Sequence, residues 1–249
     1  MSFSIITVSY NSQNTIEDSI QSLIKQSIFN NVQYIVVDGG SSDDTKKILN
    51  KHNAKIDILI SEKDQGIYDA MNKGISLASG DIIGILNSDD VYANESVLEK
   101  VAGIFQSNPD IDIVYGDLVY VDQHDLNKIV RKWNSKTYYD RFFENANVPP
   151  HPSVFLRRAV YDQMGLFDLN FKLAADYEFL LRIFKSNLFK SYYVPEVFVK
   201  MRLGGATNKS FKNIIQGNKE IVRAWTKNGN KMPWYFFPLK FLKRFSQFF

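Results

Sequence analysis

The chain contains no cysteine and only three histidines in 249 residues, His52, His124 and His151. The absence of cysteine excludes disulfide frameworks, cysteine nucleophiles and zinc–thiolate sites, and it fits a cytosolic protein. The histidines are too few and too scattered for a histidine metal site. Any metal or base in this protein must therefore come mainly from other residue types.

Long apolar runs are also missing. No stretch reaches the roughly 20 apolar residues that are needed to span a bilayer. The N-terminal segment 1–6 (MSFSII) lacks a basic start and a long apolar run, so we expect no signal peptide. The length fits one large α/β domain with a small addition.

The net charge of +3 is not spread over the chain. Residues 231–249 carry Lys231, Lys240, Lys243 and Arg244 without any acid, which leaves the rest of the chain about neutral. A broad basic surface is therefore absent, and we expect no nucleic-acid partner.

The first half of the chain alternates short β-branched runs with amphipathic helical patterns, which is typical of a mostly parallel sheet. The predicted strands are 4–9, 33–38, 56–61 and 81–86, and the predicted helices are 12–26, 42–51, 67–78 and about 95–106. The pattern changes at residue 113. Two antiparallel strands over 113–121 and 128–133, a loop over 134–152, a strand over 153–157, a helix over 174–185 and one or two strands over 189–200 are expected to follow.

These elements predict an α/β fold with a Rossmann-like, mostly parallel central sheet flanked by helices, plus a small antiparallel addition. Polar residues collect where the parallel strands end: Tyr10 and Asn11, Asp38, Glu62 and Asp64, and Asp89 and Asp90. Ligands bind beyond the carboxyl ends of such strands. Carboxylates gathered in one crevice repel each other, and a divalent cation bound together with substrate phosphates relieves that repulsion.

Each of these acids also has a simpler interpretation. Asp38 and Asp64 could be turn residues, and Glu62 a solvated surface charge. Asp89 and Asp90 could cap the helix near residue 95, although that helix begins too late for both.

Other nucleotide-binding folds lack their signatures here. No G-x-G-x-x-G follows the first strand, and no Walker A sequence is present. The first strand ends without an acid, which removes the nucleophile of a phosphoaspartate hydrolase, and no serine nucleophile elbow occurs.

Four segments closely resemble the family 2 glycosyltransferases with the GT-A fold, and they occur along the chain in the order expected of that family. They are 7–11 (TVSYN), 38–45 (DGGSSDDT), 86–90 (LNSDD) and 61–74 (SEKDQGIYDAMNKG), the last of which resembles the branch that builds bacterial surface polysaccharides. The resemblance covers residues 3 to about 205. It implies a GT-A domain over 1–210, with a nucleotide-binding half at 1–112 and an acceptor-binding half at 113–210.

The resemblance implies roles at the donor site. Tyr10 would stack on the nucleobase, the Val8 backbone would contact it, and Asp38 would hydrogen-bond the uracil ring or its equivalent. Asp90 would bind the Mn²⁺ or Mg²⁺ that bridges the diphosphate, and Asp89 would meet the ribose or the metal. The remaining residues assigned to the donor site are Asn11, Asp64, Lys73, Asn87 and Arg202.

One departure lies at Asn87, where the family often has aspartate. An amide can still donate a hydrogen bond, but it is a weaker candidate for a metal ligand.

The segment 173–179 (LAADYEF) resembles the family's Glu-Asp segment, whose aspartate deprotonates the acceptor hydroxyl. Asp176 takes that place, and Ala175 replaces the usual acid. A single base opposite the leaving diphosphate suits an inverting transfer. Asp176 could instead be a helix N-cap, and Glu178 should point away from it.

Two later features complete the resemblance. His151 precedes a strand in a segment near the acceptor pocket, and Arg202 with Gly204-Gly205 resembles a loop that closes over the donor phosphates. The alternatives are that His151 has only a structural role and that Arg202 lies on the surface.

The tail over 211–249 is expected to be helical. In a helix from Pro238, one face carries Phe237, Phe241, Phe245 and Phe248, and the other carries Lys240, Lys243, Arg244 and Gln247. This pattern indicates an amphipathic helix at a membrane surface, and deletion of 233–249 should then release the protein from membranes. A helix docked on the domain or on a second subunit is the alternative.

Together these features predict a cytoplasmic enzyme at the inner face of the plasma membrane. It would transfer a sugar from a nucleotide sugar, UDP-linked in the first instance, to a hydroxyl of a glycan or polyprenyl-linked acceptor. Two rivals stay open. A sugar-phosphate nucleotidyltransferase lacks its Gly-rich, basic loop here, and a non-catalytic binding or scaffold subunit is kept open by Asn87 and Ala175.

Overall fold

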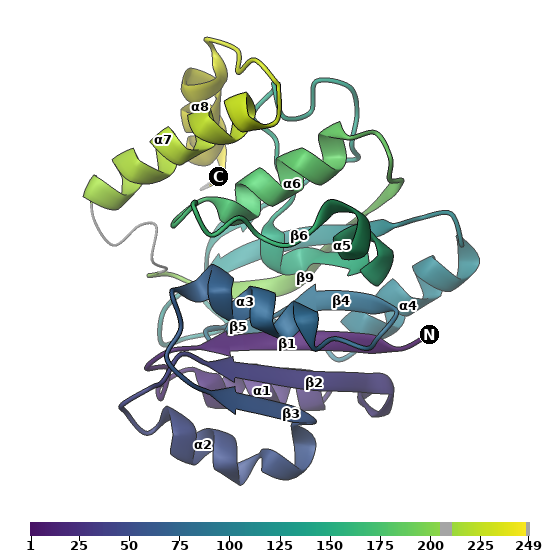
Figure 1. Ribbon diagram of the computed structural model, residues 1–249, viewed down its shortest axis with the longest axis vertical. Helices are drawn as coiled ribbons and strands as arrows, with labels where there is room; N and C mark the ends of the chain where they lie inside the picture. The colour runs from purple at the N-terminus through teal and green to yellow at the C-terminus, as the bar shows by residue number, and fades with distance from the viewer. Residues whose placement is uncertain (205–210, 248–249) are drawn as a thin grey trace.

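The computed structural model of the chain describes residues 1–204 and 211–247, and in this part nine strands form one sheet (Figure 1). The strand order is β3-β2-β1-β4-β8-β6-β9-β5, with β7 paired to β6. The strands are β1 (Phe3–Ser9), β2 (Val32–Asp38), β3 (Ile58–Ser61), β4 (Ile82–Ile85), β5 (Asp90–Tyr92), β6 (Ile113–Val121), β7 (Ile129–Trp133), β8 (Val154–Arg157) and β9 (Ser191–Arg202). The helices are α1 (Ile16–Ile24), α2 (Thr45–Lys51), α3 (Ile67–Ser76), α4 (Val97–Ser107), α5 (Arg158–Met164), α6 (Ala175–Lys185), α7 (Phe211–Lys227) and α8 (Phe236–Ser246), and the 3₁₀ helices are η1 (Phe29–Asn31), η2 (Asn53–Lys55) and η3 (His151–Ser153).

The first four strands form the parallel part of the sheet. β1 pairs in parallel with β2 and β4, and β2 pairs in parallel with β3. Every residue of β1 is buried, because helices cover both faces of the sheet there. The predicted antiparallel pair is also present, since β6 and β7 run antiparallel. The expected α/β sheet with an antiparallel addition is confirmed.

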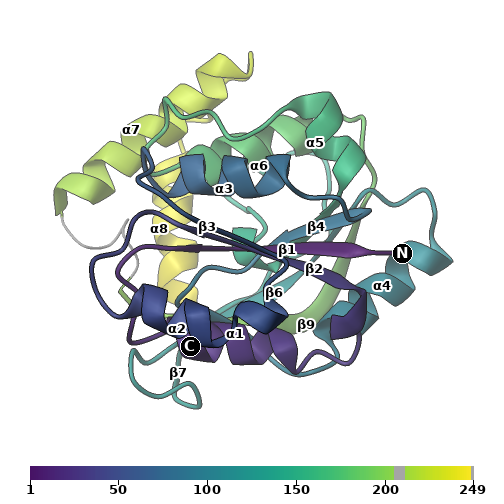
Figure 2. The ribbon, with the colours of Figure 1, turned by 60° about the horizontal axis from the view of Figure 1, so that its bottom comes forward.

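Helices lie on both faces of the sheet (Figure 2). Helices α1, α2 and α4 cover one face, and α3, α5, α6 and α7 cover the other. Ile16, Ile20 and Leu23 on α1 recur every three to four residues and are fully buried, as the helical period requires. Phe179 and Ile183 on α6 are likewise buried, which confirms their predicted inward direction.

Two short elements were not predicted. β5 has only three residues, and it exists because it pairs with β9, more than 100 residues later. α5 follows β8 without a linker. Neither element has a hydrophobic period that is long enough to be recognised locally.

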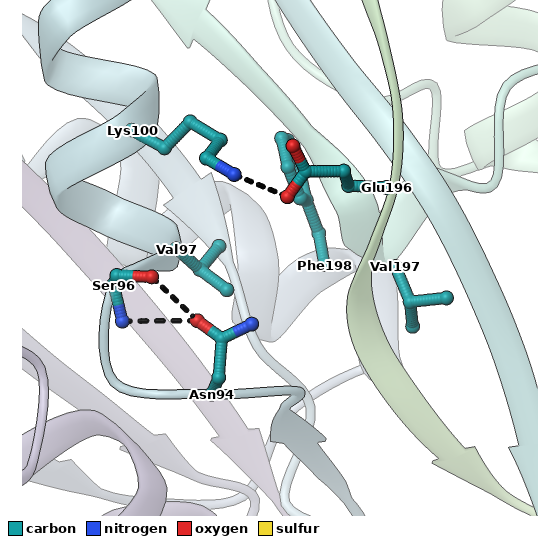
Figure 3. Close-up of a pocket in the computed structure, with 7 residues that line it drawn as sticks. All are labelled: Asn94, Ser96, Val97, Lys100, Glu196, Val197 and Phe198. Carbon is teal, nitrogen blue, oxygen red and sulfur yellow. Dashed lines mark hydrogen bonds and ion pairs between the residues drawn. The ribbon is translucent and has the colours of Figure 1, made fainter.

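The turn between β5 and α4 is fastened to β9 (Figure 3). The side-chain oxygen of Asn94 accepts hydrogen bonds from the backbone N–H and the hydroxyl of Ser96, at 3.0 and 2.9 Å. Lys100 on α4 forms an ion pair with Glu196 on β9. These contacts hold the segment that follows Asp90.

The C-terminal helices pack on α6. Phe236, at the start of α8, is 1% exposed, and its ring centroid lies 6.3 Å from that of Tyr177 on α6 and 5.9 Å from that of Trp225 on α7. At the other end of α8, the Gln247 carbonyl accepts from the Lys132 N–H of β7 at 3.0 Å. Helix α8 therefore begins two residues before the predicted Pro238 and is docked at both ends. Among the described residues, no helix is long and apolar enough to cross a membrane.

Candidate active site

The loops after β1 and β2 are joined by hydrogen bonds. Asn11 has a positive φ of 49°, a conformation that asparagine tolerates better than most residues. Its N–H donates to the Ser41 hydroxyl at 2.8 Å, and its side-chain oxygen accepts from the Ser42 N–H at 2.9 Å. The Ser12 N–H donates to the Thr45 hydroxyl at 2.7 Å. Asn11 therefore holds the loops after β1 and β2 together.

Val8 and Tyr10, next to this loop, differ in exposure. Val8 is buried in β1 opposite Val37, so only its backbone can meet a ligand. The Tyr10 side chain is 65% exposed at the carboxyl end of β1. An exposed ring at this edge suits stacking on a flat nucleobase, and both assignments remain predictions.

Asp38 is fully buried, and both of its carboxylate oxygens are used. One oxygen accepts from the Ser9 hydroxyl at 3.2 Å and from the Ser41 hydroxyl. The other accepts from the Ser41 N–H at 3.0 Å and from the Ser61 hydroxyl at 2.7 Å. Asp38 thus holds the turn after β2, and a contact with the nucleobase would have to replace one of these donors.

Asp64 lies against the same turn. A Cβ atom on Gly39 would stand 2.4 Å from its Oδ2, so glycine at residue 39 makes room for this carboxylate. The other carboxylate oxygen of Asp64 accepts from the Gly66 N–H at 2.9 Å. The ends of β2 and β3 are in this way brought together, as the predicted acidic pocket requires.

Lys73 on α3 pairs with nearby acids. Its Nζ lies 2.7 Å from Glu62 and 3.5 Å from Asp69. The hydrogen bond to Glu62 is the main reason that the pKa of Lys73 is raised. Its ammonium is committed to these two acids, and its predicted contact with the donor is untested.

The segment from Asn87 to Asp90 places two carboxylates at the end of β4. Asp90 is fully buried, and its Oδ2 accepts from the Asn87 amide at 2.9 Å. The Oδ1 atoms of Asn87 and Asp90 are buried without a hydrogen-bond partner among the described residues. Burial and the neighbouring charge of Asp89 raise the pKa of Asp90 well above its usual value, against the opposing effects of Asn87 and Arg202. Asp89 itself is partly exposed.

This segment fits a divalent cation that arrives with a diphosphate. In the described chain, no three acidic, histidine or cysteine side chains gather to hold a metal on their own. Asp89 and Asp90 offer hard oxygen ligands, and Mg²⁺-like ions are commonly bound by one or two carboxylates plus substrate phosphates. The buried Asp90 oxygen that has no partner among the described residues leaves an acceptor that such an ion could use.

Arg202, at the end of β9, is buried rather than on the surface. Its guanidinium donates to the Asp89 carbonyl at 3.1 Å and forms an ion pair with Asp18 on α1. Arg202 therefore fastens the backbone of Asp89. Its predicted contact with the donor phosphates is untested, and Gly205 of the predicted closing loop lies outside the described residues.

Asp176 lies in the first turn of α6 and is partly exposed. Its Oδ1 accepts a hydrogen bond of 2.8 Å from the Tyr68 hydroxyl on α3. Burial, followed by the charge of Asp176, raises the pKa of Tyr68 well above its usual value, so the phenol stays protonated as a donor. The N-cap of α6 is Ala174, so Asp176 is not the capping residue. Glu178 is fully buried and pairs with cationic side chains elsewhere, as expected.

His151 joins the same group from η3. Its ring packs edge-on against Phe167 at 5.4 Å, and Tyr68 lies 5.7 Å from the same ring. Burial lowers the pKa of His151, and the carboxylate of Asp176 opposes this effect. Phe167 packs against both His151 and Tyr68, and Tyr68 donates to Asp176, so the three side chains belong to one cluster. Tyr68 lies in the recognised segment 61–74, but its position alone did not reveal its partner.

Solved structures with the same architecture include a mannosyltransferase and a protein in complex with a UDP-sugar. TarS 1–349 of S. aureus in complex with UDP-GlcNAc superposes with a TM-score of 0.72 at 20% identity, over 93% of this chain and 68% of that chain. The mannosyltransferase PcManGT of Pyrobaculum calidifontis, in complex with GDP-Man and Mn²⁺, gives a TM-score of 0.66 at 15% identity, over 98% and 69% of the two chains. The fold is the GT-A fold.

Sequence comparison also finds glycosyltransferases among the similar proteins. A PGL/p-HBAD biosynthesis glycosyltransferase of Mycobacterium bovis is 29% identical over 210 residues, which cover 83% of this chain and 79% of the relative. The E. coli UDP-Glc:alpha-D-GlcNAc-diphosphoundecaprenol beta-1,3-glucosyltransferase WfgD is 30% identical over 225 residues, covering 89% and 83%. Residues 4–165 match glycosyl transferase family 2. The chain belongs to this family, and it is a glycosyltransferase; this sets aside the nucleotidyltransferase and scaffold alternatives.

Proposed function

We propose that this enzyme transfers a sugar, with inversion, from a UDP-sugar to a hydroxyl of a glycan or a polyprenyl-linked acceptor in surface polysaccharide or glycolipid biosynthesis. The name of the E. coli relative specifies a UDP-sugar donor and a lipid-diphosphate acceptor, and the TarS complex contains UDP-GlcNAc. Both observations support this substrate class.

The main observation in support of the proposal is the environment of the Asp176 side chain. Its carboxylate is partly exposed, oriented by the Tyr68 hydroxyl and flanked by His151. Asp176 takes the proton of the acceptor hydroxyl while the acceptor oxygen bonds to the anomeric carbon and the bond to the diphosphate breaks. One displacement by one base inverts the anomeric configuration.

On the donor side, Tyr10 and the Val8 backbone meet the nucleobase, on a scaffold built by Asn11, Asp38 and Asp64. Asp90, with its buried unpartnered oxygen, and the more exposed Asp89 would hold Mn²⁺ or Mg²⁺. The ion would neutralise charge on the departing diphosphate.

The proposal also includes contact with a membrane surface through α8. Trp234, Phe241, Leu242 and Phe245 are exposed by 88, 72, 63 and 62%. Aromatic and apolar side chains clustered at one surface, with the exposed Arg244 beside them, are typical of helices that lie in a bilayer interface. Of the predicted apolar face, Phe237 is partly buried and Phe248 lies outside the described residues.

A donor screen tests the transferase proposal. Purified protein with Mn²⁺ is given UDP-, GDP- and dTDP-sugars, and release of the nucleotide is measured with lipid-linked and glycan acceptors. We expect turnover with a UDP-sugar that falls by ~10³-fold in Asp176→Asn. The exposed Asp162→Asn on α5 is the matched control and should keep full activity. Equal activity of Asp176→Asn and the control would refute Asp176 as the base.

Membrane contact needs point variants rather than deletion of 233–249. Deletion would remove Phe236 from the core, which costs roughly 1.5–3 kcal/mol of hydrophobic burial. Phe241→Ser with Phe245→Ser should reduce co-sedimentation with phosphatidylglycerol vesicles. Leu188→Ser, which changes a residue that is 59% exposed outside the tail, should not. Equal sedimentation of all three proteins would exclude α8 as the contact.

A further inference from the structure

Helix α6 carries the proposed base, and its own residues provide no cap for its N-terminus. The N-cap residue is Ala174, which makes no side-chain capping hydrogen bond. Backbone N–H groups at the start of a helix have no partner within the helix. Ala174 is buried, and a buried N–H group without an acceptor is costly. An acceptor must therefore come from another part of the chain.

Glu220 on α7 supplies this acceptor. Its Oε2 accepts from the Leu173 N–H at 2.8 Å and from the Ala174 N–H at 3.0 Å. Its Oε1 accepts from the Gln216 amide at 3.0 Å. Glu220 is 3% exposed, and the helix dipole stabilises a negative charge at a helix N-terminus. Because both oxygens are engaged and enclosed, Glu220 is placed to hold backbone groups rather than to meet a substrate.

Helix α7 lies beside α6 (Figure 1), and it also holds the residues that follow Asp176. The Trp225 indole N–H donates to the Tyr177 hydroxyl at 2.9 Å, and both residues are buried. The Lys227 Nζ donates to the Oε1 of Glu178 at 3.1 Å, and Glu178 is fully buried. Contacts from α7 therefore reach the chain on both sides of Asp176.

We propose that Glu220 is a positioning residue for the transfer reaction. Its carboxylate fixes the backbone at the start of α6 and thereby the place of the Asp176 carboxylate. This inference rests on the proposed function, which assigns Asp176 as the base. Tyr68 orients the Asp176 carboxylate from α3, and Glu220 holds the turn that carries it. A general base must lie within hydrogen-bond distance of the acceptor hydroxyl, so a displaced turn slows proton transfer.

Kinetics of Glu220 variants test this role. Glu220→Ala removes the acceptor of two N–H groups and should lower kcat by ~10-fold through misplacement of the base. The donor KM should not change, because the donor binds at the ends of β1 to β4. Glu220→Gln keeps a carbonyl oxygen for the N–H groups and should keep most of kcat. Lys219→Ala, at the exposed neighbouring residue of α7, is the matched control.

A second control separates positioning from loss of stability. Val101→Ala shortens a fully buried side chain on α4, across the sheet from α6, and destabilises the protein without touching the base. All variants are assayed at a temperature at which circular dichroism shows them folded. Val101→Ala should keep the kcat of wild type. An equal fall of kcat in Val101→Ala and Glu220→Ala, or a rise in donor KM in Glu220→Ala, overturns the proposal.

Hydrogen exchange tests the cap without requiring turnover. The backbone amides of segment 173–178 should exchange ~10-fold faster in Glu220→Ala, in line with loss of hydrogen bonds to a charged group. Glu220→Gln and Lys219→Ala should exchange as wild type does. Unchanged exchange of this segment in Glu220→Ala overturns the proposal.

A double variant tests whether Glu220 acts through Asp176. In single-turnover assays, Glu220→Ala should cause no further loss in the Asp176→Asn background, since the base is already absent. The same fold-loss in both backgrounds overturns the proposal. Full activity of Asp176→Asn alone would instead refute the proposed function, and with it any role of Glu220 in transfer. Faster exchange of segment 173–178 in Glu220→Ala would then identify Glu220 as a helix cap only.

Discussion

The proposed donor and acceptor sides of the active site hold their acids in different ways. On the donor side, Asp38 and Asp64 are held by hydroxyls and backbone N–H groups of neighbouring loops, and the buried Asp90 has one oxygen without a hydrogen-bond partner among the described residues. On the acceptor side, the partly exposed Asp176 accepts a hydrogen bond from the Tyr68 phenol, which comes from a different helix. The acids of the donor side are therefore mostly enclosed by their own loops, whereas Asp176 keeps an accessible carboxylate.

After the loss expected for Asp176→Asn, the largest effect is expected on the donor side. Asp89→Ala removes the more exposed carboxylate of the pair and should lower kcat/KM by ~100-fold or more, equivalent to about 2.7 kcal/mol. Steady-state kinetics over a Mn²⁺ titration measure it. Asp162→Asn, at an exposed residue of α5, should stay within about 2-fold of wild type. A variant that keeps the Mn²⁺ dependence of wild type would remove Asp89 from the metal site.

The next largest effect is expected from the hydrogen bond between Tyr68 and Asp176, on the acceptor side. Tyr68→Phe removes the 2.8 Å hydrogen bond to Asp176 and should lower kcat by ~10-fold, because hydrogen bonds to charged groups contribute about 1.5–3 kcal/mol. The KM for the donor should not change, since Tyr68 serves the base. Tyr192→Phe, at an exposed tyrosine of β9, is the matched control. A rise in donor KM without a fall in kcat would assign Tyr68 to the donor side instead.

A smaller effect tests how closely the donor loops pack. Gly39→Ala would place a Cβ atom 2.4 Å from the Asp64 carboxylate and should destabilise the protein by about 1–3 kcal/mol. Urea unfolding measures the loss. Gly103→Ala on α4, where a Cβ atom meets nothing within 4 Å, should be neutral or stabilising. Equal stability of the two variants would show that the Asp64 side chain moves away at no cost.

The smallest expected effect is a gain in stability rather than a loss. The pKa of Asp90 is raised in the folded protein, so its ionisation at neutral pH opposes folding. Asp90→Asn keeps an acceptor for the Asn87 amide and should raise the Tm in EDTA by about 2–4 °C for each 1 kcal/mol gained. The gain should vanish at low pH, where the carboxyl is protonated in both folded and unfolded chains, and grow as the pH rises through the raised pKa.

Thermal unfolding from pH 4 to 8 checks this prediction. Mn²⁺ with UDP should stabilise wild type more than Asp90→Asn, because the ion supplies the missing positive charge. A Tm below that of wild type at every pH would mean that the Asp90 carboxylate stabilises the metal-free fold.

The positions of the polar residues at the ends of β1 to β4 could be predicted from the sequence, and the surroundings of Asp176 only in part. The ends of β1 to β4 follow from local patterns, since parallel strands bring their carboxyl ends to one edge. Asp176 was identified through a resembling segment. Its contact with Tyr68 joins residues that are 108 positions apart, and no local period encodes such a pair.

The tail shows a related limit. The helical period predicted an aromatic and a basic face on α8, but in the structure Arg244 is exposed together with Phe241 and Phe245, whereas Phe237, Lys240 and Lys243 are partly buried. The period could not tell which side of the helix the domain would cover. That choice depends on Phe236, which fits between Tyr177 and Trp225, and on the polar residues that receive the lysines.

The packing of Phe236 also affects where Asp176 lies relative to α8. Phe236 packs against Tyr177, which is the residue next to Asp176, so α8 is attached to the same turn of α6 as the proposed base. A bilayer contact made by α8 therefore fixes the height of Asp176 above the lipid. The enzyme would then accept only hydroxyls that lie at one distance from the membrane surface. The length of the lipid chain within the membrane would not matter.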